Sequence, residues 1–343
     1  MPDLSRRKVL GLSALAVAAT ALGGCGTRSS SGVVAFGRID VHQHMVPEAY
    51  RRWLATHGVL DSGGLAVPEW SASAAIASMD RIGTARSVLS VSTPGVTPAA
   101  NAAEAADMAR AVNDEGAELA KDRPDRFGFF ATVPLPAVDD AAAEAGRALD
   151  DLGADGIVVL AHSADVYLGQ TGQGELFAEL NRRHAVALVH PGPLPGPAVP
   201  GIPPLAADFL LDTTRAAYLL VRNEIVARYP DIRFVLSHAG GFLPYAADRM
   251  ALVIARETGL QPDVVREQFR TFYFDTALST GAATLPALLS FAKPDHVVFG
   301  SDWPFAPQAA VDQFTGGLHH YLGVNEAVRQ AIDRDNALAL FAE

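Results

Sequence analysis

Asp40-Val41-His42-Gln43-His44 is the stretch of sequence that decides the fold. It ends an apolar run that begins at Arg38. Side chains in a strand repeat every second residue, so His42 and His44 are expected on one face. Two imidazoles at a strand end can bind one divalent ion, which predicts a metal site. A lone His-x-His pair is often accidental, and the interpretation therefore depends on the rest of the chain.

Three further apolar runs end in side chains of the same chemistry. His190 and His238 each end a run, and Asp302 follows another. Neutral imidazole and carboxylate ligands suit Zn²⁺ or a similar first-row ion. If the runs are parallel strands of one barrel, all five side chains meet at its C-terminal mouth.

From about residue 33 onward, short β-branched runs alternate with longer Ala-, Leu- and Arg-rich stretches of helical character. This order predicts an α/β fold, a TIM-type (β/α)8 barrel, in one domain over residues 34–343. The expected strands are Arg38–His42, Arg86–Ser92, Phe127–Val133, Gly156–Ala161, Ala185–His190, Ile232–His238, Phe272–Thr276 and His296–Ser301. The expected helices are Ala72–Ile82, Ala100–Lys121, Asp139–Leu152, Gly174–Arg183, Leu205–Tyr229, Leu243–Glu257 and Ala283–Ala292.

Two insertions follow strands of the expected barrel. Met45–Trp70 comes after the first strand, and the Pro- and Gly-rich Pro191–Pro204 comes after the fifth. Both follow C-terminal strand ends, where this fold builds its active site, so they are candidate pocket walls.

Composition fits one large globular unit. The chain has 343 residues, of which 49% are hydrophobic and 19% are charged. The formal net charge is −11, and the acidic residues are scattered rather than gathered into a tail. Binding to a phosphate backbone has little electrostatic support, so nucleic acid is not an expected partner.

The N-terminal segment resembles an export signal. Arg6 and Arg7 precede the mostly apolar stretch Leu10–Leu22, which has the length of a signal h-region and is too short to span a bilayer. We expect residues 1–24 to be a twin-arginine and lipoprotein signal peptide.

Leu22-Gly23-Gly24-Cys25 looks like a bacterial lipobox, and Cys25 is the only cysteine of the chain. The expected mature protein therefore begins at a lipidated Cys25, followed by a flexible tether over residues 25–33. Its expected place is the extracytoplasmic face of the bacterial cell membrane, which it touches only through this lipid.

The stretch from about Arg38 to Phe341 resembles the amidohydrolase-related family (amidohydrolase 2), in the group of aminocarboxymuconate-semialdehyde decarboxylase and the hydroxybenzoate decarboxylases. This resemblance implies that the expected barrel belongs to the metal-dependent hydrolase superfamily. The strand-end motifs match in order and position. The run that includes Pro68-Glu69-Trp70 and Ser237-His238-Ala239-Gly240-Gly241 most resembles the 6-methylsalicylate decarboxylase branch.

The resemblance implies roles for single residues. His42, His44, His190 and Asp302 match the family's metal ligands, and His238 matches the histidine that transfers protons beside the metal. Arg249 matches an arginine that reaches the neighbouring subunit's pocket in muconate-type members, which implies substrate binding across a homodimer.

Two departures from muconate-type members bear on the substrate. Those members carry a substrate-binding arginine before the tryptophan that corresponds to Trp70, whereas Asp61–Glu69 contains no arginine. They also have a tryptophan where this chain has Gly192. The muconate semialdehyde is therefore not the expected substrate.

The lysines bear on the number of metal ions. Binuclear members of the family commonly bridge two ions with a carboxylated lysine on the fourth strand. The lysines of this chain are Lys8, Lys121 and Lys293, and none lies in Gly156–Ala161. We therefore expect one divalent ion per subunit, Zn²⁺ with Mn²⁺ as the alternative.

Further side chains near the expected mouth have two readings each. Asp275 could hydrogen-bond a substrate hydroxyl or cap the following turn. Trp303 and Phe305 could form an aromatic wall of the pocket or only pack in their loop. His162 could line the pocket, although a solvated loop histidine is the simpler reading.

The expected activity is metal-dependent non-oxidative decarboxylation of a hydroxybenzoate or salicylate-type carboxylic acid, with His238 and Asp302 handling the proton. An alternative within enzymes is hydrolysis of a lactone, ester or amide by the same site. The reading from a different class is a lipid-anchored, non-catalytic binding protein, which would be expected to have lost some of the five side chains.

Overall fold

The structure is a computed structural model that describes residues 37–342. The expected signal peptide over residues 1–24 and the expected tether over residues 25–33, with Cys25, lie outside the described residues. None of the described helices combines the length and the apolar character that crossing a membrane requires.

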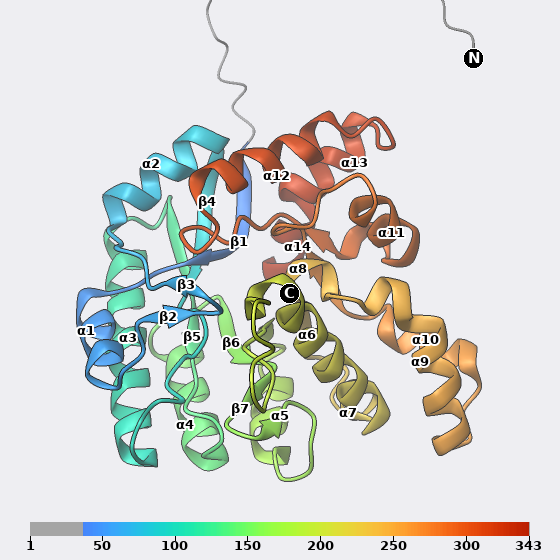
Figure 1. Ribbon diagram of the computed structural model, residues 1–343, viewed down its shortest axis with the longest axis horizontal. Coiled ribbons are helices and arrows are strands. Elements are labelled where there is room, and N and C mark those ends of the chain that lie inside the picture. The colour runs from blue at the N-terminus through green and yellow to red at the C-terminus, as the bar shows by residue number, and fades with distance from the viewer. Residues whose placement is uncertain (1–36, 343) are drawn as a thin grey trace, which may run out of the picture. The chain divides into compact units, whose positions relative to one another are not determined.

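The described residues fold into a barrel of parallel strands, and Figure 1 shows helices around this barrel. Its strands form one eight-stranded sheet in which every pairing is parallel. The backbone N–H of Val41 donates to the carbonyl of Phe299 at 3.0 Å, which joins the first strand to the end of the last. In sheet order the strands are β1 (Arg38–His44), β4 (Thr84–Ser90), β5 (Phe127–Thr132), β6 (Gly156–Leu160), β9 (Val186–His190), β10 (Arg233–Leu236), β11 (Tyr273–Asp275) and β12 (Val297–Val298).

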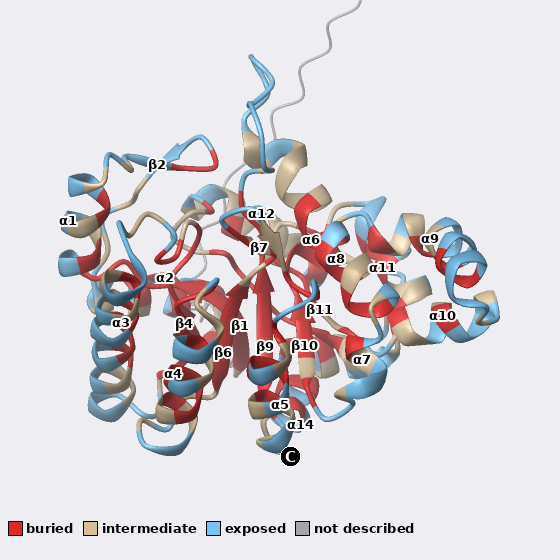
Figure 2. Cartoon of the chain, turned by 90° about the horizontal axis from the view of Figure 1, so that it is seen from below, coloured by how far each residue is buried: buried red, intermediate tan, exposed pale blue. Residues whose placement is uncertain are grey.

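The strands are buried on both faces, which explains why they read as continuous apolar runs. In Figure 2 the strands are coloured as buried, and the helices that surround them have exposed outer faces. One set of strand side chains fills the barrel interior, and Ala337 and Leu340 of helix α14 (Asn336–Ala342) belong to the same cluster. The interior members on the strands are Ile39, Val41, Val88, Phe130, Val158, Val186, Leu188, Val235 and Val298.

Most of the expected helices are present, with small shifts at their ends. Ser71 and Asn101 cap the first two through side-chain oxygens that accept the N–H of Ala74 and of Glu104. The helices that cover the barrel are α2 (Ala72–Ile82), α3 (Ala102–Asp122), α4 (Val138–Asp150), α5 (Gly174–Arg182), α6 (Pro204–Arg222), α9 (Leu243–Thr258), α10 (Pro262–Phe269), α11 (Thr284–Phe291) and α12 (Gln308–His320).

One expected helix is two. Leu205–Tyr229 was expected as a single helix, but α6 ends at Arg222 and a short α7 (Ile225–Arg228) follows. Glu224 between them takes the left-handed conformation, with φ 60°, which no α-helix continues through.

The loops at the C-terminal strand ends contain structure that the sequence did not predict. The first insertion holds α1 (Glu48–Thr56) and a hairpin of β2 (Asp61–Ser62) and β3 (Leu65–Ala66). A second hairpin of β7 (His162–Ser163) and β8 (Val166–Tyr167) follows β6. The chain after α12 continues through α13 (Glu326–Gln330) and a π-helical turn (Ala331–Asp335) into α14.

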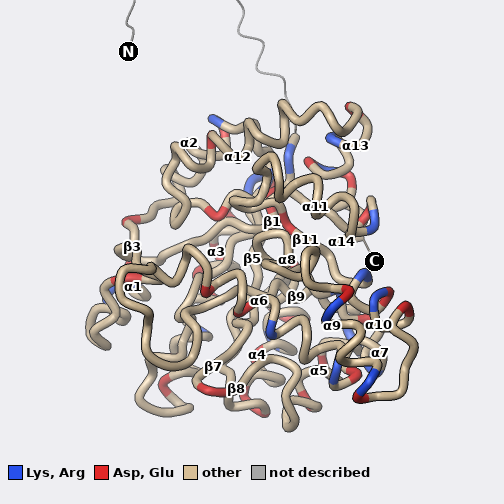
Figure 3. The backbone as a smooth tube through the Cα atoms, turned by 45° about the vertical axis from the view of Figure 1, so that its right-hand side comes forward, with Lys and Arg blue, Asp and Glu red and all other residues tan. Residues whose placement is uncertain are grey.

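Acidic and basic residues both occur along the chain around α7, α9 and α10 (Figure 3). Arg222 pairs with Glu257 at 3.0 Å, and Arg266 pairs with Asp263 at 3.0 Å. These are exposed pairs, and such pairs contribute little to stability.

Candidate active site

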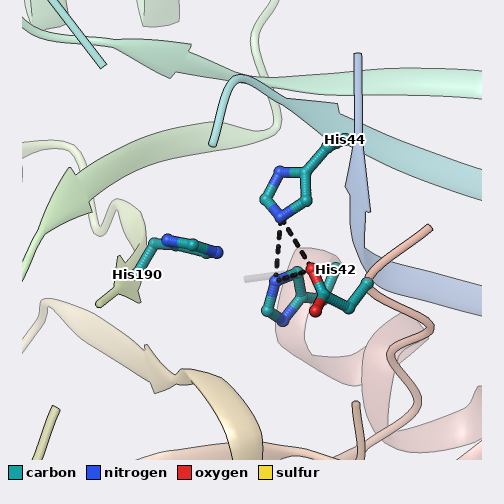
Figure 4. A group of neighbouring side chains, drawn as sticks. His42, His44 and His190 are labelled. Carbon is teal, nitrogen blue, oxygen red and sulfur yellow. Dashed lines mark hydrogen bonds and ion pairs between the residues drawn. The ribbon is translucent and has the colours of Figure 1, made fainter. Parts of the chain in front are cut away.

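Four side chains that were expected as metal ligands lie together at the mouth of the barrel. The ligand atoms of His42, His44, His190 and Asp302 all lie within 4.8 Å of one another. All four residues are buried, and Figure 4 shows the imidazoles of His42 and His44 close together, with His190 beside them. Nε2 of His44 is 3.1 Å from Nε2 of His42 and 3.1 Å from Oδ1 of Asp302.

Each of the three imidazoles makes a hydrogen bond through Nδ1, on the side of the ring away from the other ligand atoms. His42 Nδ1 lies 2.7 Å from Oδ2 of Asp275, and His44 Nδ1 lies 3.1 Å from Oγ of Ser90. His190 Nδ1 donates to the carbonyl of Pro191 at 2.8 Å. Metal-binding histidines are typically oriented in this way, because the bond at one ring nitrogen leaves the other as the ligand atom.

The electrostatics of the group favour a cation. Burial lowers the pKa of His44 and lowers that of His190 well below its usual range, so both imidazoles are neutral. Burial opposes charge on His42 too, but the neighbouring Asp275 and Asp302 carboxylates raise its pKa to about 9. Burial also acts against ionisation of Asp302, yet the nearby histidines hold its pKa below the usual range. Three nitrogens and a carboxylate therefore fit a divalent first-row ion.

A second, overlapping group of possible ligands consists of His42, His238 and Asp275. The carboxylate of Asp275 is already engaged, since Oδ2 contacts His42 and Oδ1 accepts the backbone N–H of His238 and of Ala277, both at 2.9 Å. Asp275 is fully buried and is not among the residues that line the cavity described below. Of the two readings that the sequence left open, the structure shows the cap of the following turn, through the N–H of Ala277, and Asp275 also orients His42.

His238 lies at the mouth but not in a strand. The expected strand Ile232–His238 ends at Leu236, and a short turn, α8 (Ser237–Gly240), follows in which His238 has φ 55°. Its Nδ1 lies 3.2 Å from the carbonyl of Ala277, which makes Nδ1 the donor and leaves Nε2 as the basic nitrogen. The His238 ring is 5.0 Å from that of His42, measured between centroids, and it lines the cavity.

Asp302 also has a left-handed backbone, with φ 62°. Its backbone N–H donates to the carbonyl of His42 at 2.7 Å, and the neighbouring N–H of Ser301 donates to Oδ1 of Asp40 at 3.1 Å. Gly300 precedes them because a Cβ there would lie 2.8 Å from the Cβ of His42. Non-glycine residues in this strained conformation cluster at functional sites, as His238 and Asp302 do here.

A cavity of about 620 Å³ opens beside this group, with His190, His238 and Asp302 in its wall. The first insertion contributes Ser62 and Leu65 to the wall, as expected. The described cavity wall has no residue of Pro191–Pro204, and α6 directly after it supplies Leu205 and Phe209 instead. The first insertion meets the start of α6, where the N–H of Leu205 donates to the carbonyl of Gly63 at 3.2 Å.

Of the two aromatic side chains expected as a pocket wall, Phe305 lines the cavity, with its ring edge-on to His44 at a centroid distance of 5.4 Å. Trp303, Arg249 and His162 lie outside the cavity wall. Trp303 is half-buried and packs between two apolar clusters. Arg249 is exposed on α9. His162 is half-buried rather than solvated, and its Nδ1 lies 3.0 Å from both carboxylate oxygens of Asp212.

Asp212 and Ser90 are residues whose part in the site the sequence analysis missed. Asp212 is fully buried on α6, and its Oδ2 accepts the N–H of Gly192 at 2.9 Å. The one available signal was an acidic residue directly after the apolar segment Phe209–Leu211, since a buried carboxylate needs a partner. Ser90 ends a strand and carried no signal of its own.

The sequence profile of the amidohydrolase family matches residues 39–342. A 6-methylsalicylic acid decarboxylase of Penicillium expansum is 37% identical over 314 residues, which cover 89% of this chain and 96% of that protein.

Among solved structures, that of an amidohydrolase II has a TM-score of 0.85 at 31% identity, covering 89% of this chain and 100% of that one. A dihydroxybenzoic acid decarboxylase of a Polaromonas species, solved with bound manganese and the inhibitor 2-nitroresorcinol, has a TM-score of 0.73 at 22% identity. It covers 89% of this chain and 96% of that one, and at this identity the likeness concerns the fold alone.

Proposed function

Since this chain belongs to the amidohydrolase family, we propose that it is a metal-dependent non-oxidative decarboxylase, a carbon–carbon lyase, of a hydroxybenzoate or salicylate-type acid. One observation carries the proposal. His238 lines the same cavity as His190 and Asp302, so a proton-transferring imidazole and a group of possible metal ligands face one substrate space. The 37% identity to a 6-methylsalicylic acid decarboxylase supports this reaction class.

In the proposed enzyme His42, His44, His190 and Asp302 hold one divalent ion per subunit, Zn²⁺ or Mn²⁺. Such an ion would supply Lewis-acid chemistry there and would stabilise negative charge on the oxygens of a bound salicylate. The protein itself orients the three imidazoles, because Asp275, Ser90 and the Pro191 carbonyl hold them through Nδ1.

His238 is the proton donor in the proposed reaction. A protonated His238 donates from Nε2 to the ring carbon that carries the carboxylate, the bond from that carbon to the carboxylate breaks, and its electron pair restores the aromatic ring as CO₂ leaves. The carbonyl of Ala277 holds the ring through Nδ1 and sets its direction.

A substrate panel tests the reaction class. The purified protein, with its metal content quantified, is offered hydroxybenzoates that include 6-methylsalicylate, and lactones, esters and amides in parallel. We expect CO₂ with the matching phenol from at least one hydroxybenzoate. Release of acid from a lactone, ester or amide without CO₂ would assign the same side chains to a hydrolase. A metal-loaded protein that turns over neither class would be a binding protein.

We further infer that the protein is exported by the twin-arginine route and held at the extracytoplasmic membrane face by a lipid on Cys25. Support comes from Arg6-Arg7, the apolar stretch Leu10–Leu22 and the lipobox-like Leu22-Gly23-Gly24-Cys25. Cell fractionation with a Cys25→Ser variant tests the anchor. We expect the native chain in the membrane fraction and the variant in the soluble extracytoplasmic fraction, whereas equal distributions would contradict lipidation.

We also infer a homodimer in which Arg249 contacts substrate in the partner subunit. The exposed position of Arg249 outside its own cavity wall supports this arrangement. Sedimentation measures the oligomeric state, and Arg249→Ala should raise KM for the acid. A monomer with full activity would contradict the inference.

A further inference from the structure

His190, His238 and Asp302 form one end of the cavity, which we call the polar end. The remaining lining residues are mostly apolar, with the hydroxyl side chains of Ser62, Ser92, Tyr245, Ser279 and Thr284 among them. Two of the few other polar side chains are already bonded within the protein, since Ser62 Oγ donates to the Thr93 carbonyl at 2.8 Å and Ser279 Oγ donates to that of Ala277 at 2.9 Å. The described lining contains no lysine, arginine, asparagine or glutamine.

The apolar part of the cavity reaches the protein surface. Tyr245, near the start of α9, lines the cavity and is 91% exposed. Ala283 and Ala287 of the α11 segment and Pro307 before α12 line it as well and are exposed. The space therefore continues outward from the polar end, along small side chains between α9, α11 and α12, and we call this part the apolar arm.

The arm exceeds what a small ring needs. A cavity of about 620 Å³ lies in the range of pockets that enclose drug-sized ligands, whereas a salicylate is a single ring with two small polar groups. A salicylate fixed at the polar end would leave the arm to water, in contact with apolar walls. Filling such a space with hydrocarbon is favourable, because each buried methylene contributes to binding.

We propose that the substrate is an aromatic acid whose ring carries an apolar substituent longer than a methyl group, which lies in the apolar arm. This inference rests on the proposed function and extends it from the reaction to the substrate class. The carboxylate and its neighbouring hydroxyl take the polar end, and the alkyl chain runs past Ala287 toward Tyr245.

The test compares two series, 5-alkyl- and 6-alkylsalicylates from hydrogen to pentyl, with the full chain and a quantified metal content. In one of the series, kcat/KM should rise about fourfold for each methylene that leaves water, up to the length of the arm. Dissociation constants of the matching alkylphenol products, measured by calorimetry, should fall in parallel. This second readout does not depend on turnover.

Two variants locate the effect. Ala287→Phe fills the arm at an exposed helix position and should remove most of the gain from methyl to propyl. Ala309→Phe is the matched control, because Ala309 is an exposed alanine of α12 outside the cavity lining. It should leave the gain unchanged.

The outcomes separate this inference from the proposed function. If salicylates lose CO₂ but neither series gains beyond methyl, or if Ala287→Phe keeps the full gain, the inference is wrong and the decarboxylase stands. If the alkylphenols bind with the expected dependence on chain length while no acid loses CO₂, the arm is real and the proposed reaction is wrong.

Discussion

The Asp212 carboxylate accepts the backbone N–H of Gly192 at 2.9 Å. That N–H belongs to the same peptide unit as the Pro191 carbonyl, which accepts a hydrogen bond from His190 Nδ1 at 2.8 Å. The Asp212 carboxylate on α6 is thus linked to His190 by hydrogen bonds through one peptide unit. Asp275 contacts the His42 imidazole directly. Negative charge at the N–H side polarises the peptide toward its carbonyl, which makes His190 Nε2 a better ligand.

Asp212→Asn should therefore weaken metal binding. The amide can still accept one hydrogen bond, but the negative charge is lost. Changes to such outer partners typically reduce metal affinity about 10- to 100-fold, and we expect a loss in this range. Competition with a chromophoric chelator measures the dissociation constant. Glu144→Gln is the control, because Glu144 is a buried carboxylate bonded to Asn113 and Arg147, away from the cavity. Equal metal affinity in the Asp212 variant and the native chain would contradict the proposed effect of Asp212 on His190 through this peptide.

His238→Asn should abolish turnover while the metal content stays near that of the native protein. A positioned proton donor contributes about 10²- to 10⁴-fold to rate, so kcat should fall at least by the lower figure. The measurement combines CO₂ release with metal analysis of the same sample. His57→Asn is the matched control, since His57 contacts Glu104 in the outer layer. A variant that keeps more than a tenth of native kcat would remove His238 from the proton step.

Metal removal should lower the melting temperature. A ligand present at 100 times its dissociation constant stabilises the folded state by about 2.7 kcal/mol. For a domain of roughly 300 residues that corresponds to a shift of some 4 °C. Calorimetry with and without chelator measures it. A His44→Ala, His190→Ala double variant should show no chelator effect, and an identical shift in that variant would mean that the ion binds elsewhere.

Arg38→Met should destabilise the protein by about 3 kcal/mol or more, because it leaves Asp333 buried without its partner at 2.8 Å. Burial raises the pKa of Asp333, although Arg38 acts in the opposite direction. A carboxyl with a raised folded-state pKa contributes stability at low pH that is lost as the pH rises through that pKa.

The deficit of Arg38→Met should consequently be larger at pH 8 than at pH 5. Urea unfolding at both values measures it, and the double variant Arg38→Met, Asp333→Leu serves as the control because it removes the buried charge. A deficit that does not change with pH would show that lost packing of Arg38, not the unpaired carboxylate, causes the effect.

The barrel could be predicted because parallel strands buried on both faces leave an unambiguous apolar signal. All eight expected strands correspond to strands of the barrel, although β12 is confined to Val297–Val298. The hairpins β2–β3 and β7–β8 were missed, since two-residue strands carry too little pattern to distinguish them from loops. The break at Glu224 was missed as well, because it depends on a backbone conformation that glutamate rarely adopts.

The meeting of His42, His44, His190, His238 and Asp302 followed from their place at strand ends, which the fold brings to one mouth. The hydrogen-bond partners of these imidazoles could not be predicted in the same way. Ser90 lies beside His44 through the register of β1 and β4. Asp212 reaches the N–H of Gly192 through the packing of α6, and the Pro191 carbonyl accepts from the preceding His190 through the local loop geometry, neither of which the sequence pattern encodes.

The most direct test of the central claim is the fate of the carboxyl carbon and of the proton. Metal-loaded protein is given 6-methylsalicylate labelled with ¹³C in the carboxyl group, in D₂O, and products are analysed by NMR. Decarboxylation through His238 should release the label as CO₂ and leave one deuterium on the ring carbon that carried the carboxylate. A label that stays on the ring under conditions in which the same sample hydrolyses a lactone, ester or amide would contradict the decarboxylase.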